Sequence, residues 1–323
     1  YNNDSWPDIF VSNDFSFPDL LYINNQDGTF REASEEFFKH TSFYSMGADA
    51  GDFNYDGYDD LVVVDMNPED YKRSRNTMAM TDRGTFSTML NTGYGRQYMH
   101  NMLHLNTGKD GFREVSQFAG IDKTDWSWAV LNEDFDNDGH RDFYITNGIA
   151  REVINKDDFV RRTAFIREKK QRVTQEDFKT IIEGIPSEAI SNYLYINNGD
   201  MTFANATTKA GVGEPSFSQG AAAGDFDNDG DLDLVVNNYG APAFLMENTS
   251  ATQQYIQFAF EGNDTNKNGI GAKVCIETAD GTKCSTLYNS RGYMSSAMPR
   301  LHFGLGSTTG VSKATITWAD GAT

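Results

Sequence analysis

The chain has 323 residues, and its 47 acidic and 27 basic side chains give a formal net charge of −20 at neutral pH. So acidic a surface repels phosphate backbones and anionic headgroups, which disfavours nucleic acids and membrane surfaces as partners and favours multivalent cations. No apolar run approaches the roughly 20 residues that span a bilayer, so we expect no membrane insertion, and no signal or anchor within these residues. The 29 Gly, 23 Phe and 15 Tyr indicate a turn-rich β protein.

One sequence unit recurs along the chain. A Gly/Ala-rich stretch, an acidic loop and a Val/Ile-rich stretch occupy residues 47–64, 128–145 and 220–236. A stretch similar to Leu-Tyr-Ile-Asn follows each unit, and after the first two units a stretch similar to Thr-Phe-Arg-Glu completes a hairpin. The same hairpin stands at residues 20–32, so the N-terminus carries the end of a fourth copy, and the chain begins inside a motif as a fragment or a processed chain would. Four short strands per unit predict an all-β fold of tandem propeller blades.

The acidic loops follow the pattern Asp-x-Asp/Asn-x-Asp-Gly-x-x-Asp. Oxygen side chains stand at positions one, three, five and nine, Gly at position six can turn the chain back, and position seven offers a backbone carbonyl. This flexible, all-oxygen cage suits Ca²⁺ and offers no thiolate or imidazole for a transition metal. The candidate ligands of three complete sites and one partial N-terminal site are Asp52, Asn54, Asp56, Tyr58 and Asp60; Asp134, Asp136, Asp138, His140 and Asp142; Asp225, Asp227, Asp229, Asp231 and Asp233; and Asn2, Asp4 and Asp8, where Ser5 replaces the Gly.

The alternative interpretation is that these loops are ordinary polar turns, because turns commonly use Asp, Asn and Gly. Several unneutralised carboxylates so close together would repel one another, which favours a bound ion.

Two insertions, residues 66–100 and 149–191, separate the second and third strands of two units. Since successive connections of a meander alternate between its ends, we expect both insertions on the face opposite the acidic loops. The second insertion is predicted to be helical, with Asp157 or Asp158 as N-cap, and its nine basic residues nearly balance its eight acidic ones. The first is rich in Arg, Tyr and Met, and its candidate ligand-binding residues are Tyr71, Arg73, Arg75, Tyr94, Arg96, Tyr98 and His100.

The two cysteines, Cys275 and Cys284, flank Ala279-Asp280-Gly281 in a stretch that alternates like a hairpin. Partners across a hairpin have about the β-carbon separation that a disulfide needs. A bridge would imply an oxidising compartment; two reduced, half-buried thiols are the alternative.

The acidic units resemble the FG-GAP or VCBS-type calcium-binding repeats of integrin-like β-propellers. Residues 269–274, 291–296, 300–306 and 316–321 resemble the ASPIC/UnbV domain that follows such repeats in extracellular proteins. The resemblance implies blades over residues 1–250, as part of a propeller that is seven-bladed in integrin-like relatives. It also implies a small β domain over residues 251–323, which stops just after the Trp318 strand as a truncated domain would.

The whole resembles the surface proteins that Bacteroidota encode beside outer-membrane glycan-uptake systems, in which calcium is structural and no catalytic residues are established. The first hypothesis is therefore an extracellular or outer-membrane surface module for binding or adhesion, which is stabilised by calcium and engages a glycan or a partner protein through its inserted loops. A second is a propeller-type polysaccharide lyase for acidic glycans, with Tyr71, Tyr94, Tyr98 or His100 as base and Arg73, Arg75 or Arg96 neutralising a uronate. A third is a scaffold subunit of an outer-membrane uptake assembly. We assign no catalytic residue and favour a non-enzymatic role.

Overall fold

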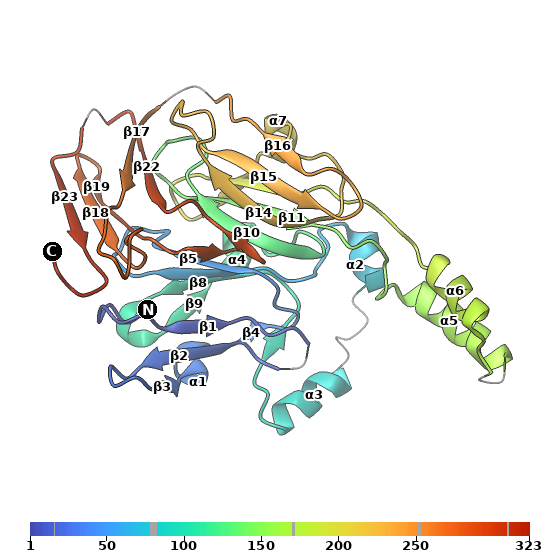
Figure 1. The fold of residues 1–323 in the computed structure, drawn as a ribbon. Helices are drawn as coiled ribbons and strands as arrows, with labels where there is room; N and C mark the ends of the chain where they lie inside the picture. Colours follow the sequence, from blue (N-terminus) through green and yellow to red (C-terminus); the bar gives the residue numbers. More distant parts are fainter. Residues whose placement is uncertain (16, 78–82, 170–171, 251–252, 309) are drawn as a thin grey trace.

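Four small antiparallel sheets follow one another along the first 250 residues (Figure 1). The computed structural model describes residues 1–15, 17–77, 83–169, 172–250, 253–308 and 310–323. Within each sheet the strand order is the chain order, which is the meander expected of a propeller blade. The strands are β1 (Ile9–Val11), β2 (Leu20–Asn24) and β3 (Phe30–Glu32); β5 (Ala48–Gly51), β6 (Asp60–Val63), β8 (Met102–Asn106) and β9 (Phe112–Glu114); β10 (Ser127–Glu133), β11 (Asp142–Asn147), β12 (Tyr193–Asn197) and β13 (Phe203–Asn205); and β14 (Ser218–Gly224), β15 (Asp233–Asn238) and β16 (Phe244–Met246).

Two of these sheets have the predicted four strands, whereas the first and the last have three among the described residues. One-turn helices follow the last strand of the first three sheets, and they are α1 (Ser34–Phe37), α4 (Ser116–Ala119) and α7 (Thr207–Ala210). A short parallel pair, β4 (Thr41–Ser42) and β7 (Gln97–Tyr98), ties the first insertion to the segment that follows α1. The 3₁₀ turn η1 (Gly108–Asp110) lies between β8 and β9.

The hydrophobic core lies between neighbouring sheets. Successive side chains of a strand point to opposite faces, and in β11 both faces are buried. Phe143 and Ile145 pack with Val62 of the second sheet, whereas Tyr144 packs with Leu234 of the fourth. A strand buried on both faces reads as a continuous apolar run, which is why Phe143, Tyr144 and Ile145 stand together in the sequence.

The two insertions form helices at one end of the sheets. The first contains α2 (Tyr71–Thr77) and α3 (Arg83–Asn91), and its residues 78–82 lie outside the described part. The second folds into α5 (Lys156–Glu168) and α6 (Gln175–Glu183), which project from the body as an arm (Figure 1). Among the described helices, none combines the length and the apolar character needed to cross a membrane.

The helical prediction for the second insertion is confirmed, but the predicted N-cap is wrong. Asn155 caps α5, and its side chain accepts the N–H of Asp158. The carboxylate of Asp158 is instead occupied by Arg161 and Arg162 one turn further along. Asn is as good an N-cap as Asp, so the cap moved two or three residues upstream.

The C-terminal residues form a separate set of strands. Strand β17 (Gln254–Ala259) pairs with β22 (Arg300–Gly306), β18 (Lys273–Thr278) lies between β19 (Gly281–Thr286) and β23 (Lys313–Thr317), and β20 (Ser290–Arg291) pairs with β21 (Ser295–Ser296). Cys275 and Cys284 stand directly opposite each other in the β18–β19 hairpin, as the hairpin interpretation predicted. They form a disulfide and not the alternative pair of reduced thiols.

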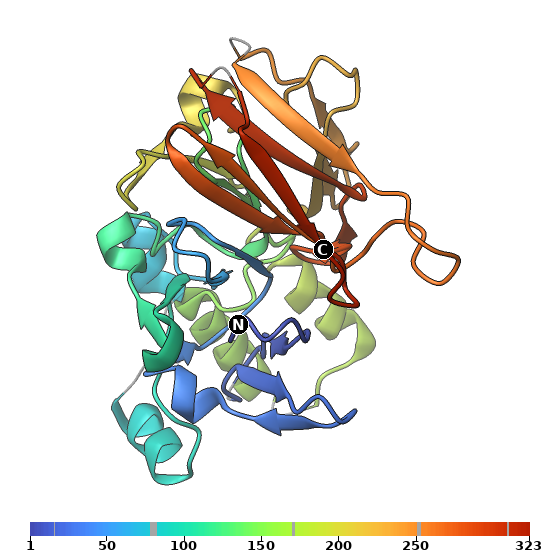
Figure 2. The same cartoon turned by 90° about the vertical axis from the view of Figure 1, so that its left-hand side faces the viewer.

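The C-terminal strands lie against the end of the sheets that carries the acidic loops, and the helical insertions lie at the other end (Figures 1 and 2). Small residues let the first strands of neighbouring sheets approach one another closely. A β-carbon on Gly47 would lie 2.3 Å from the carbonyl oxygen of Trp128, and one on Gly220 would lie 2.7 Å from Ser295 Oγ in β21. The Gly/Ala-rich first strands thus make room for one another and for the C-terminal hairpin.

We expect Gly47→Ala to lower the free energy of unfolding by about 1–3 kcal/mol, because the added methyl group would overlap backbone that cannot easily move. Gly310→Ala is the matched control, since a β-carbon there meets nothing within 4 Å. Urea denaturation of both variants measures the difference. Equal stability of the two would contradict the close approach of the inner strands.

Candidate metal centres at the acidic loops

Each acidic loop is shaped by its own carboxylates accepting backbone N–H groups. In the first loop Asp52 Oδ2 accepts the N–H of Gly57 at 2.9 Å, and Asp56 Oδ1 accepts the N–H of Tyr58 at 2.9 Å. In the second loop Asp134 Oδ2 accepts the N–H of Gly139 at 2.8 Å. Gly57 and Gly139 have φ of 91° and 92°, a conformation that glycine adopts without strain.

Position four of each loop, two residues before the glycine, also has a positive φ. The residues at position four, Tyr55, Asn137 and Asn228, have φ of 60°, 57° and 63°. The N-terminal copy repeats both features, because Asn3 and Ser5 have φ of 57° and 67°. Ser5 therefore takes the backbone conformation of the glycine that it replaces.

The carboxylate at position nine is held by a residue that sequence reasoning did not single out. Asp60 Oδ2 accepts the N–H of Phe53, and Asp60 Oδ1 accepts the N–H of Asn106 at the end of the third strand. The Asn106 side chain in turn donates to the carbonyl of Asp59. Equivalent bonds tie Asn24 to Asp8, Asn197 to Asp142 and Asn248 to Asp233. The recurrence of Asn at one place in every repeat was the available signal.

The second and third loops bring three carboxylates together. One carboxylate oxygen from each of Asp134, Asp136 and Asp138 lies within 4.8 Å of the others, and the same holds for Asp225, Asp227 and Asp229. The first loop has Asn54 in the middle place, and the N-terminal loop has Asn2 and Asp4 joined by a hydrogen bond.

These residues fit a hard cation. Asp134 Oδ1, Asp225 Oδ1 and Asp231 Oδ1 are buried and have no hydrogen-bond partner among the described residues. Burial first, and neighbouring carboxylates second, raise the pKa of Asp134 to about 8, and burial likewise raises the pKa of Asp60 to about 8. Carboxylates in such surroundings require an opposite charge, and Ca²⁺ with six to eight oxygen ligands supplies one.

The C-terminal domain supplies cations at the same end. The Nζ of Lys283, on β19, lies 5.4 Å from the ring centroid of Tyr55 in the first loop. Burial lowers the pKa of Lys283, and the nearby carboxylates of Asp134 and Asp138 oppose that shift. His302 Nε2 lies 2.5 Å from Asn137 Oδ1. The domain thus covers the acidic loops with polar contacts of its own.

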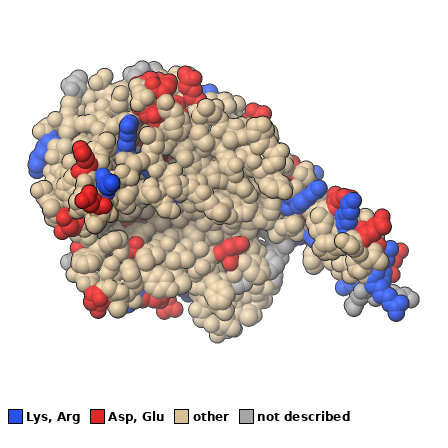
Figure 3. Space-filling view, in the orientation of Figure 1, with Lys and Arg blue, Asp and Glu red and all other residues tan. Residues whose placement is uncertain are grey.

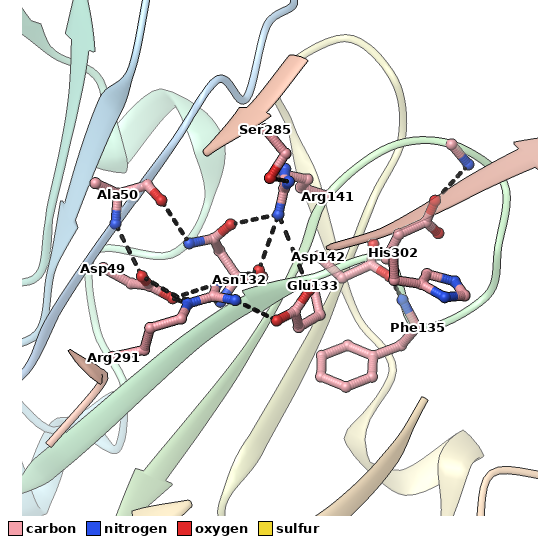
Figure 4. Close-up of polar contacts among 12 residues, drawn as sticks. Asp49, Ala50, Asn132, Glu133, Phe135, Arg141, Asp142, Ser285, Arg291 and His302 are labelled. Carbon is pink, nitrogen blue, oxygen red and sulfur yellow. Dashed lines mark hydrogen bonds and ion pairs between the residues drawn. The ribbon is translucent and has the colours of Figure 1, made fainter. Parts of the chain in front are cut away.

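A second cation joins the C-terminal domain to two inner strands (Figure 4). Arg291 Nη2 lies 2.7 Å from Asp49 Oδ2 on β5 and also donates to the carbonyl of Asn132 on β10. Arg291 Nη1 pairs with Glu133, the neighbour of Asn132. In the other direction Arg141, from the second loop, donates to Ser285 Oγ of β19 at 2.6 Å. The motif containing Arg291 was visible in the sequence, but these partners were not.

The candidate residues of the first insertion separate into two groups. On α2, Tyr71 is exposed beneath the guanidinium of Arg75, whereas Arg73 is bound at 2.6 Å by each of Asp125 and Glu152. These ion pairs occupy Arg73, so its charge is not available to a uronate.

The other group lies around a hollow of about 350 Å³. Tyr94 and Arg96 line it together with His40, and the ring of Tyr98 packs against those of His40 and His100. Deeper in the same region His104 is buried in β8, and burial lowers its pKa to about 3.

The sequence matches three protein families. Residues 1–63 and 187–236 match the FG-GAP-like repeat, residues 217–256 match the FG-GAP repeat, and residues 262–323 match the ASPIC and UnbV domain. FG-GAP repeats form propeller blades and often bind calcium, so the matches imply blades in the matched parts of the chain. The chain belongs to the FG-GAP repeat proteins that carry a C-terminal ASPIC/UnbV domain.

A curated relative with a similar segment is human cartilage acidic protein 1. The two are 42% identical over 52 residues, which is 16% of this chain and 8% of the length of that protein.

Calcium should raise the midpoint of thermal unfolding relative to chelated protein. An ion that binds only the folded state stabilises it by about 2.7 kcal/mol at a hundredfold excess over Kd. Asp134→Asn should reduce the shift, whereas Asp200→Asn, in an exposed hairpin turn, should leave it unchanged. The same midpoint with calcium and with chelator would show that the loops are only turns.

Replacing Arg291 with Met should destabilise the chain by about 3–5 kcal/mol, because Asp49 and Glu133 would be left without their counter-charge. Arg31→Met is the control, since Arg31 and Glu36 form an exposed pair whose loss should change stability by under about 1 kcal/mol. Denaturation in saturating calcium compares them. Similar losses in the two variants would mean that Arg291 does not hold the domains together.

Proposed function

We propose that this chain is a calcium-stabilised binding module of an extracellular or outer-membrane surface, and that the arm of α5 and α6 contacts a partner protein. The calcium part is supported by buried oxygens of the acidic loops that have no hydrogen-bond partner within the described part of the chain. The extracellular part is supported by the Cys275–Cys284 disulfide, because such bonds persist in oxidising compartments.

The observation that carries the partner assignment is the apolar surface of the arm. Phe159, Val160, Phe178 and Ile182 are all exposed on α5 and α6, and the two phenylalanines are 61% and 60% accessible. The arm projects away from the propeller core (Figure 1). Exposed aromatic side chains on a projecting element are typical of a protein interface.

The charges of the arm favour a protein over an acidic glycan. Figure 3 shows basic and acidic side chains mixed along it. Lys169 pairs with Asp177 and Lys179 with Glu183, so much of its positive charge is neutralised locally. An acidic polymer would need a larger excess of positive charge than the nine basic against eight acidic residues of this insertion supply.

The base of the arm is fixed to the body. The Glu152 carboxylate, just before α5, is bound by Arg73 of α2, and the Glu152 N–H donates to the carbonyl of Pro186, after α6. Lys156 Nζ donates to the carbonyl of Arg75. These contacts with the first insertion therefore fix the orientation of the base of the arm.

Photo-crosslinking tests this function. A benzoylphenylalanine in place of Phe178, in the calcium-loaded full chain, should capture a surface protein of the source cells, and the adduct should disappear with Phe159→Ser. The same group in place of Phe30, which is exposed on β3, is the control.

Two results would contradict the partner assignment. Equal capture from positions 30 and 178 would show that the arm is not the contact. Binding to an array of acidic glycans that is lost with Arg96→Gln, without capture at position 178, would instead assign the function to a glycan at the hollow beside Arg96.

A further inference from the structure

Two histidines and a glutamate from separate segments meet between the first and second sheets. His40 follows α1, His100 precedes β8, and Glu114 ends β9. One ligand atom of each lies within 4.8 Å of the others, and His40 Nε2 is 3.7 Å from Glu114 Oε2. This cluster shares no residue with the acidic loops.

We propose that His40, His100 and Glu114 bind a divalent transition metal of the zinc type. Imidazole nitrogen and carboxylate oxygen are ligands that Zn²⁺ accepts, whereas calcium prefers oxygen alone. Three protein ligands leave a fourth position of a tetrahedral site for water. His40 lines the hollow of about 350 Å³ described above, which gives that position access to solvent.

Hydrogen bonds already orient two of the three ligands. His100 Nδ1 lies 2.7 Å from the carbonyl oxygen of Asn101 and 3.3 Å from Ser116 Oγ. Donation to that carbonyl places the proton on Nδ1, so Nε2 is the nitrogen that a metal would take. Glu114 Oε1 accepts the N–H of Ser116 at 2.6 Å, which leaves Oε2 on the side of His40. Such outer contacts are what set the tautomer and direction of metal ligands in proteins.

A third histidine supports the assignment. His104 stands directly opposite Glu114 in the β8–β9 register, and its ring centroid is 6.5 Å from that of His40. Its side chain is 2% exposed, and Nε2 has no hydrogen-bond partner among the described residues. A buried imidazole nitrogen without a partner among the described residues costs free energy, and a ligand bound beside it would offset that cost.

Only a small movement separates this arrangement from a bound state. Zinc bonds of about 2.0–2.2 Å place tetrahedral ligand atoms roughly 3.3 Å apart. His40 is partly exposed on a connecting segment, so its ring can move toward the other two ligands.

The test is zinc titration of the untagged full chain in saturating calcium, which keeps the acidic loops occupied. Calorimetry should show one zinc per chain, and His40→Gln and Glu114→Gln should each weaken binding by on the order of 100-fold. Glu36→Gln, on the exposed side of α1, is the control and should bind as the parent does. Circular dichroism and the unfolding midpoint establish that each variant folds.

Cobalt gives an independent spectroscopic readout. Co²⁺ bound by two histidines and a carboxylate should show the strong visible absorption of tetrahedral coordination, and His40→Gln should abolish it. No zinc binding in excess calcium would overturn the proposal. So would zinc affinity that is the same in the parent and in His40→Gln, or weak octahedral-type cobalt absorption.

Discussion

Acidic side chains buried at one end of the blades are the constraint on which the rest of this structure depends. A carboxylate removed from water needs hydrogen bonds and an opposite charge, or it destabilises the fold by several kcal/mol. Backbone N–H groups supply the first requirement, as at Asp60, which accepts from Phe53 and Asn106. Oxygens such as Asp134 Oδ1 remain without a partner among the described residues, and a calcium ion is the charge that fits them.

The position of the C-terminal domain follows from the same constraint. It brings Lys283 to the acidic loops and Arg291 to Asp49 and Glu133 on the inner strands. Repeats and C-terminal domain therefore form one electrostatic unit at this end of the molecule. The insertions lie at the opposite end, where the arm can engage a partner without disturbing the ion sites (Figure 1). The His40 cluster lies between the first two sheets, and it includes His100 at the end of the first insertion.

Features with a local cause could be predicted from the sequence, and features with a long-range cause could not. The repeats predicted the order of the strands, and the hairpin spacing placed Cys275 opposite Cys284, because register and turn length fix both. The spacing left open whether the two form a bond, and the structure shows that they do. The cap of α5 was misplaced by a few residues, since Asn155 and the acidic residues after it are all good caps. The partners of Arg291 and the proximity of His40 to Glu114 depend on how the blades and the C-terminal domain pack. The repeat pattern of the sequence contains no information about that packing.

Hydrogen exchange with and without calcium tests the central claim, that ion sites and C-terminal domain are one unit. The account predicts that calcium slows exchange in the acidic loops and also in residues 283–304 of the C-terminal domain, while the exposed arm of α5 and α6 is unchanged. Protection confined to the loops, with the C-terminal domain exchanging at the same rate in calcium and in chelator, would contradict it.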